Sequence, residues 1–125
     1  MITKFAGASI WSENLNNLLP FYRDVLGINL LDDPEGAGFV RVGARSDNEP
    51  ALGIGTHSDV RGRNNDPVRF MIGFESDNIM ADWKRLKAAG VEFVQEPQDD
   101  EYLMIATLKD PEGNYVQLFQ LSQSK

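Results

Sequence analysis

Few side chains in this 125-residue chain have the chemistry of a catalytic or metal-binding group. The chain has a single histidine, His57, and no cysteine. A thiolate nucleophile, a disulfide framework and Cys-ligated zinc or iron–sulfur centres are therefore excluded. Because His57 has no neighbours suited to completing a metal site, we interpret it as a solvent-facing linker residue. A general base in a cleft is the alternative.

Gln117 is the polar residue best placed to face a binding site. It lies in "DPEGNYVQLFQ", residues 110–120, where a tight turn is followed by an alternating strand pattern. Alternation places Gln117 on one face with Tyr115 and Phe119. Its amide can both donate and accept hydrogen bonds. We predict that Gln117 contacts a ligand in a cleft, and a hydrogen bond to a neighbouring protein group is the alternative.

Aromatic and thioether side chains form a second group of candidates. Alternation along the predicted strands places them on or near the inferred concave faces. Flat rings and flexible thioethers suit a planar or apolar small molecule, although packing within a closed barrel or against a second subunit gives the same pattern. The predicted lining consists of Phe5, Trp11, Met71, Tyr102, Met104 and Phe119, with Ser9 beside Trp11 on the first strand.

Two arginines lie between apolar neighbours on predicted strands. Arg41 and Arg69 would reach the concave side by alternation, where a guanidinium can pair with a carboxylate or phosphate of a ligand. An exposed edge position, or an ion pair with Glu75, is the simpler alternative. The acidic run 99–101 is interpreted as a solvated loop, and attraction of a cationic ligand is the alternative.

The elements that position these residues begin with a strand over residues 2–11, "ITKFAGASIW". A helix is predicted from Ser12 or Asn14, as N-cap, to Gly27, as stop. Pro20 falls in or near the first turn of this helix, where its missing N–H costs little, and a kink or a later start is the alternative. Three short strands then follow over residues 28–33, 38–43 and 50–56.

The same order of elements returns after a polar segment, residues 57–67, which we predict to be a linker. Leu15 and Ile79 open the two predicted helices 64 positions apart. The second set consists of a strand over 68–75, a helix over 78–90 and strands over 91–95, 102–109 and 115–120. We therefore predict one domain, residues 1–125, of two β-α-β-β-β modules: about 1–56 and about 68–121.

Composition limits the partners of such a domain. The chain carries 12 Lys and Arg against 19 Asp and Glu, a net charge of -7. This surface repels phosphate backbones and anionic lipids, so neither nucleic acid nor a membrane is an expected partner. No segment approaches 18 consecutive apolar residues. We predict a soluble, cytoplasmic protein.

Three motifs stand in the order and spacing of a known superfamily: "FYRDVLG" at residues 21–27, "LKAAGV" at 86–91 and "DPEGN" at 110–114. With these motifs and its two modules, the chain resembles the vicinal oxygen chelate superfamily, which includes glyoxalases, extradiol dioxygenases, methylmalonyl-CoA epimerases and bleomycin-resistance proteins. The resemblance implies an α+β fold, in which two β-α-β-β-β modules form curved mixed sheets around a cleft with helices on the outside. It also implies a homodimer.

Metal-using members of that superfamily place four ligands on their strands. Carried over to this chain, the first ligand position falls on Gly7. The ligand position in the strand that opens the second module falls on Met71, and the carboxylate position in the final strand falls on Gln117. The late position in the first module falls within residues 51–55, "ALGIG", which offer no donor side chain. Catalytic metal sites need about three protein ligands. We therefore predict no metal and no cofactor.

The function predicted from these residues is a metal-independent binding protein of the bleomycin-resistance type. It would sequester an aromatic, possibly cationic, small molecule in its cleft. A lyase, isomerase or dioxygenase of the same superfamily is the alternative, either with unrecognised metal ligands or metal-free. A third possibility is a dimeric interaction module whose cleft is filled by its own side chains.

Overall fold

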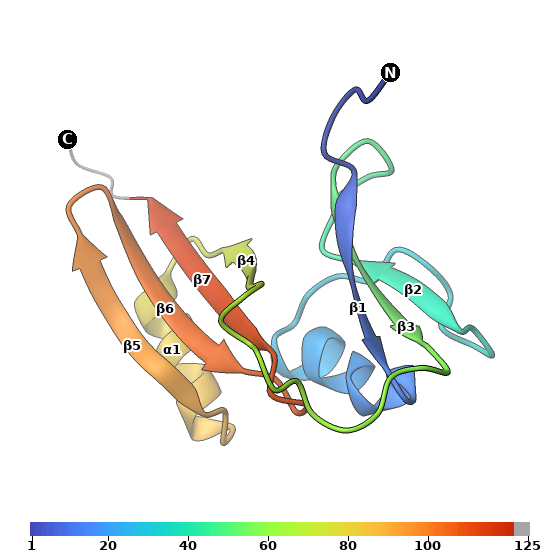
Figure 1. Ribbon diagram of the computed structural model, residues 1–125. Coiled ribbons are helices and arrows are strands. Elements are labelled where there is room, and N and C mark those ends of the chain that lie inside the picture. The colour runs from blue at the N-terminus through green and yellow to red at the C-terminus, as the bar shows by residue number, and fades with distance from the viewer. Residues whose placement is uncertain (122–125) are drawn as a thin grey trace. The chain divides into compact units, whose positions relative to one another are not determined.

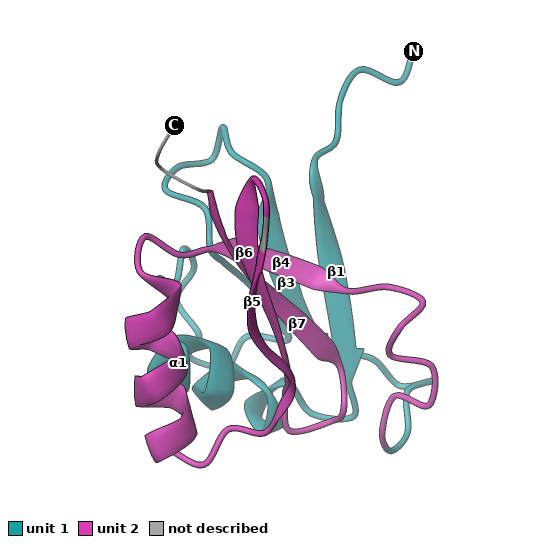
Figure 2. Cartoon of the chain, turned by 90° about the vertical axis from the view of Figure 1, so that its left-hand side faces the viewer, with its two compact units in different colours: residues 1–62 teal, residues 63–125 magenta. Residues whose placement is uncertain are grey.

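The computed structural model describes residues 1–121 and divides into two compact units. Unit 1 is Met1–Gly62 and unit 2 begins at Arg63, so the boundary lies inside the segment predicted as a linker (Figure 2). The predicted α+β class is confirmed, because seven strands form two mixed sheets beside a few short helices (Figure 1). None of the helices in the described part of the chain is long and apolar enough to cross a membrane.

The sheet of unit 1 has three strands in the order β1-β3-β2. They are β1 (Gly7–Ser12), β2 (Phe39–Val42) and β3 (Ala51–Thr56). Strand β3 is central; it pairs in parallel with β1 and antiparallel with β2. One face of this sheet buries the aliphatic residues Val40, Val42, Leu52 and Ile54.

Two short helical segments supply the rest of the unit 1 core. The segment η1 (Leu15–Asn17) is a 3-10 helix capped by the Asn14 side chain, and η2 (Phe21–Val25) is a wide π-type turn. Pro20 separates them because it has no N–H to continue a regular ladder, so the single predicted helix is replaced by two pieces. The predicted stop is Gly27, at φ +76°. The buried core residues of this region are Leu15, Leu18, Leu19 and Tyr22.

The strand predicted over 28–33 is not formed. The segment lies beside β2, where Leu31 N–H donates to the Arg41 carbonyl at 2.9 Å and Leu30 forms an isolated bridge with Val42. The Arg41 N–H, however, donates to the carboxylate of Asp32 at 2.9 Å and not to a backbone carbonyl. A side chain thus takes the place of one ladder bond and interrupts the pairing.

The sheet of unit 2 has four strands in the order β4-β7-β6-β5. The strands are β4 (Ile72–Glu75), β5 (Phe93–Asp100), β6 (Leu103–Lys109) and β7 (Tyr115–Leu121). The helix α1 (Ile79–Ala88) contacts β5, β6 and β7, as Figure 1 shows. Its predicted extent is confirmed: the Asn78 side chain caps the first turn, and Gly90 follows the last turn at φ +90°.

Two strands of unit 2 differ from their predicted bounds. Strand β4 is shorter than the predicted 68–75, because the chain turns at Arg69, whose N–H donates to the Asp66 carbonyl. Strand β5 is longer than the predicted 91–95 and extends to Asp100, so most of the acidic run is strand and not loop. Only Glu101, at φ +54°, and Tyr102 form the turn into β6.

The "DPEG" sequence occurs twice and is used differently each time. Asp110 is only 4% exposed and accepts hydrogen bonds from the N–H groups of Glu112 and Asn114, both at 2.9 Å, and from the Asn114 amide at 2.8 Å. Asn64 also joins this turn, because its N–H donates to the Glu112 carbonyl. By contrast, exposed Asp33 accepts from the N–H of Glu35. The second turn therefore positions β7, while the first is a surface turn.

Asp110→Ala is expected to lower the free energy of unfolding by about 3 kcal/mol, because it leaves the partly buried N–H donors of Glu112 and Asn114 without their acceptor. Urea denaturation followed by circular dichroism measures the change. Asp33→Ala, in the same tetrapeptide sequence, is the matched control and should cost less than about 1 kcal/mol. Equal losses in both variants would contradict the structural role assigned to Asp110.

Candidate functional site

The face of the unit 1 sheet opposite its aliphatic core carries two aromatic rings, which lie over glycines of β3. Trp11 of β1 and Phe39 of β2 both pair in register with Gly55 of β3. A Cβ atom on Gly55 would lie closer than 3.0 Å to the Trp11 ring, and one on Gly53 would do the same with the Phe39 ring. The two rings therefore rest directly on the backbone of β3.

His57 completes this aromatic cluster, which we define as Trp11, Phe39 and His57. The ring centroids of Trp11 and Phe39 are 5.5 Å apart, and the His57 ring meets Trp11 edge-on at 5.5 Å. The His57 Nδ1 atom accepts from the Asp59 N–H at 3.0 Å, so the proton of the neutral ring is on Nε2. Trp11 is 40% exposed and Phe39 41% exposed, so the rings offer surface to a ligand.

An open pocket of about 300 Å³ lies beside the Phe39 ring. Its floor is formed by small residues of β1 and β3, and its rim carries the carboxylates of Asp47 and Glu49. Glu49 accepts hydrogen bonds from the N–H and the guanidinium of Arg45, and these lower the pKa of its carboxyl. The Glu49 carboxylate is therefore negative at neutral pH. The pocket suits a flat molecule without a negative charge.

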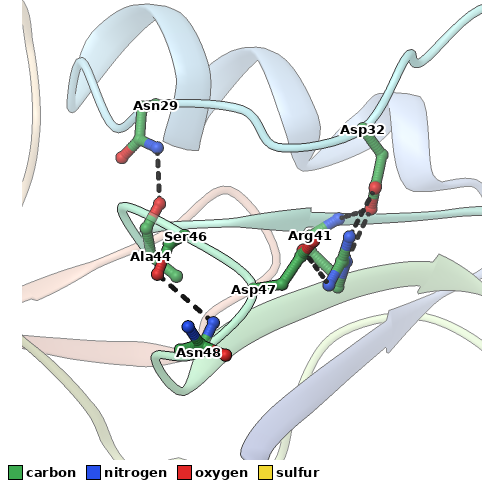
Figure 3. A network of polar contacts seen from close by, with 7 residues as sticks. All are labelled: Asn29, Asp32, Arg41, Ala44, Ser46, Asp47 and Asn48. Atoms are coloured by element: carbon green, nitrogen blue, oxygen red, sulfur yellow. Dashed lines mark hydrogen bonds and ion pairs between the residues drawn. The ribbon is translucent and has the colours of Figure 1, made fainter.

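Arg41 lies at this pocket but is already bonded to two carboxylates (Figure 3). Its Nε and Nη2 atoms donate to Asp32 at 3.0 and 2.9 Å, and its Nη1 atom lies 3.1 Å from Asp47. The hydrogen bonds that Arg41 donates to Asp32 lower the pKa of the Asp32 carboxyl and raise the pKa of the Arg41 guanidinium. The guanidinium therefore positions the 47–49 loop beside β2.

The corresponding face of the unit 2 sheet, opposite α1, carries Gln117 and Phe119 of β7. Gln117 pairs in register with Gly73 of β4 and with Thr107 of β6. The Phe119 ring covers Gly73, where a Cβ atom would be closer than 3.0 Å to it. Unit 2 thus repeats the arrangement of an aromatic ring over a glycine of the neighbouring strand.

The remaining predicted site residues lie elsewhere in their units. Phe5 precedes β1 and Tyr102 lies in the β5–β6 turn, both with largely exposed rings. Arg69 is in a loop, not a strand, and pairs with Asp66 and not with Glu75. Met71 directly precedes β4.

Met104 lies on the α1 side of its sheet and not on the face predicted by alternation. It pairs in register with Gln120, whose side-chain oxygen accepts from the N–H of Ile79 at the start of α1. The predicted strand began at Tyr102. Because Tyr102 lies in the β5–β6 turn, alternation counted from it does not give the face of Met104.

Some predicted site residues do share a face. In unit 1 these are Ser9, Trp11 and Arg41, and in unit 2 they are Gln117 and Phe119.

Sequence reasoning missed Phe39, Thr107 and Gln95 as site residues. Phe39 was detectable, because alternation in "GFVRVG" places it on the same face as Arg41. Thr107 and Gln95 were not detectable, because their alignment across the sheet with Gln117 depends on the pairing register of three strands.

Comparison with known proteins agrees with this architecture. Residues 4–118 match the family model of the Glyoxalase/Bleomycin resistance protein/Dioxygenase superfamily. The chain belongs to this superfamily. Among solved structures, the superfamily member from Sphaerobacter thermophilus is 22% identical, with a TM-score of 0.72 over 95% of this chain and 98% of that chain.

Two further solved structures with this fold come from a Streptomyces and a Micromonospora species. TnmS3, described as an antibiotic binding protein from a Streptomyces species, is 22% identical with a TM-score of 0.70, over 98% of this chain and 99% of that chain. TioX from a Micromonospora species is 15% identical with a TM-score of 0.69, over 96% of this chain and 100% of that chain. At these identities the likeness establishes the fold.

The residues at the metal-ligand positions of the superfamily do not fit a metal ion. Gly7 lies so close to β3 that a Cβ atom on it would collide with the Ala51 carbonyl oxygen, so no side chain fits there without a backbone shift. Met71 offers a thioether and Gln117 a neutral amide. No group of three or more His, Asp or Glu residues gathers within residues 1–121. No chemical step of this chain is therefore assigned to a metal.

The Arg41–Asp32 pair predicts a pH dependence of stability. The pKa of Asp32 is lower in the folded chain than in the unfolded chain, where it is about 4. The contribution of Asp32 to the free energy of unfolding is therefore fully present above the unfolded pKa and is lost as the pH falls through the folded pKa. The free energy of unfolding of Asp32→Asn should therefore fall less steeply than that of the unchanged protein between about pH 5 and pH 2.

Urea denaturation at a series of pH values measures this difference. Asp33→Asn, at the neighbouring exposed carboxylate, is the control and should follow the unchanged protein. Parallel curves for Asp32→Asn and the unchanged protein would contradict the role of the pair.

Proposed function

We propose that this chain is a cytoplasmic, metal-independent binding protein of the bleomycin-resistance type, which sequesters a planar aromatic small molecule. The observation that carries the proposal is the aromatic cluster. Gly53 and Gly55 let the Phe39 and Trp11 rings lie on the backbone with exposed surface beside an open pocket. Half-exposed rings of this kind give a large contact area to a flat ligand at little conformational cost.

The charges around the cluster favour a cation over an anion. Arg41, the guanidinium at the pocket, is neutralised by Asp32 and Asp47, and Glu49 is paired with Arg45. The net charge of -7 is therefore what attracts positive ligands. The description of TnmS3 as an antibiotic binding protein supports a sequestering role on this fold. The unsuitable residues at the ligand positions support binding without a metal.

Proflavine, a planar aromatic cation, is a suitable probe for this site. In a Trp83→Phe background, Trp11 is the remaining tryptophan, and its emission should be quenched on binding. Phe39→Ala should weaken binding about tenfold through lost stacking area, and Phe39→Tyr should retain it. Gly55→Ala should weaken binding about as much, because the new methyl group displaces the Trp11 ring.

Gly38→Ala is the matched glycine control, because a Cβ atom there meets nothing within 4 Å. Thermal denaturation of each variant separates loss of binding from loss of fold. Proflavine binding that is unchanged in both Phe39→Ala and Gly55→Ala would overturn the proposal. Stoichiometric Zn, Ni, Mn or Fe in the purified protein, together with proflavine binding that a chelator abolishes, would also overturn the proposal.

We also propose that the chain forms a homodimer. Within residues 1–121, β1 pairs only with β3 and β4 pairs only with β7, so each sheet has an edge whose backbone groups a second copy can cover. Light scattering after size-exclusion chromatography should give twice the chain mass of 14.0 kDa. A mass of one chain at micromolar concentration would contradict the homodimer.

A further inference from the structure

A row of uncharged polar side chains crosses the sheet of unit 2 on the face opposite α1. Gln117 of β7 pairs in register with Thr107 of β6, and Thr107 pairs with Gln95 of β5. On this face the row continues to Gly73 of β4, which has no side chain. Residues directly opposite on neighbouring strands lie about 5 Å apart, so their polar groups can bind one molecule together.

A bulge in β5 adds a second glutamine to the row. Gln95 pairs with Thr107 and Gln98 pairs with Ile105, so three steps along β5 match two along β6. This irregularity, which contains Pro97, brings both glutamines to one face, where the Gln95 amide nitrogen donates to the Gln98 oxygen at 2.9 Å. Bulges of this kind often redirect side chains beside binding sites. We define the polar row as Gln117, Thr107, Gln95 and Gln98.

The polar row has unused hydrogen-bonding capacity. Thr107 is 5% exposed, and among residues 1–121 neither its hydroxyl nor the Gln117 amide makes a side-chain hydrogen bond. Both groups remain open to a partner, because within residues 1–121 the one buried side-chain polar atom without a hydrogen bond is Trp83 Nε1. A hydroxyl and an amide each offer both a donor and an acceptor. The row therefore matches a partner that carries both functions.

The surroundings of the polar row do not favour anions or metal ions. The Phe119 ring lies over Gly73, and Ile105 continues the apolar surface across β6. Lys109, the cation of this face, is paired with Glu92 at 3.1 Å. A carboxylate or phosphate would thus meet no free cation here, and neutral amides and hydroxyls provide no charge to hold a metal ion.

From this geometry we infer that the polar row recognises a neutral donor–acceptor group, such as an amide or a paired carbonyl and hydroxyl, on a flat aromatic ligand. Phe119 would contact the ring system while Thr107 and Gln117 bind the polar group. This inference rests on the proposed binding function and names the chemical class of ligand that the unit 2 surface takes.

The inference can be tested with two probes that differ in one group. Equilibrium dialysis should show that the chain binds 2-naphthamide more tightly than naphthalene, because the primary amide supplies a donor and an acceptor. Thr107→Val removes the hydroxyl at constant volume and should weaken 2-naphthamide about fivefold, the value of one net hydrogen bond. Naphthalene binding should not change, and Thr107→Ser should restore the preference for 2-naphthamide.

Gln117→Leu provides an independent second variant with the same expectation, and it carries the test should Thr107→Val fail to fold. Equal affinities of the unchanged protein for the two probes would overturn the inference, while quenching of Trp11 by proflavine would leave the proposed function standing. A preference for 2-naphthamide that survives both Thr107→Val and Gln117→Leu would also overturn it. Failure of all three probes would remove the proposed function as well.

Discussion

The contact between aromatic rings and glycine backbone is the constraint on which the candidate site depends. Trp11 and Phe39 lie over Gly55 and Gly53 in unit 1, and Phe119 lies over Gly73 in unit 2. In each case the missing side chain of one strand provides the space that a ring from the neighbouring strand fills. The ring thereby restores packing that glycine removes from a sheet, and it keeps a flat apolar surface in place. A larger residue at the glycine would alter the surface without touching the ring itself.

Charge is distributed so that the surfaces proposed to bind a ligand remain neutral or negative. Arg41 is bonded to Asp32 and Asp47, which removes the positive charge most accessible to the pocket of unit 1. In unit 2 the polar row contains only amides and a hydroxyl, and Lys109 is paired with Glu92. Specificity on such surfaces comes from ring contact and from the geometry of neutral hydrogen bonds. Long-range attraction comes from the net charge of -7.

The sequence was sufficient to predict the α+β class, the order of elements in unit 2, the extent of α1 and the face on which Gln117 lies. Those features follow from local periodicity and from capping residues such as Asn78. Three features depend on contacts that periodicity does not contain. The carboxylate of Asp32 replaces a backbone acceptor and interrupts a predicted strand. The bulge in β5 changes which glutamines share a face, and the pairing of Met104 with Gln120 places Met104 beside α1.

The bulge at Pro97 also affects how this chain meets its own copies. Strand β5 is at the edge of its sheet, where a long run of unpaired N–H and C=O groups would invite strand addition and aggregation. Proline lacks the N–H that an incoming strand requires, and the bulge breaks the regular spacing of the remaining groups. The feature that turns Gln95 and Gln98 to one face therefore also protects the longest edge of the sheet from uncontrolled growth.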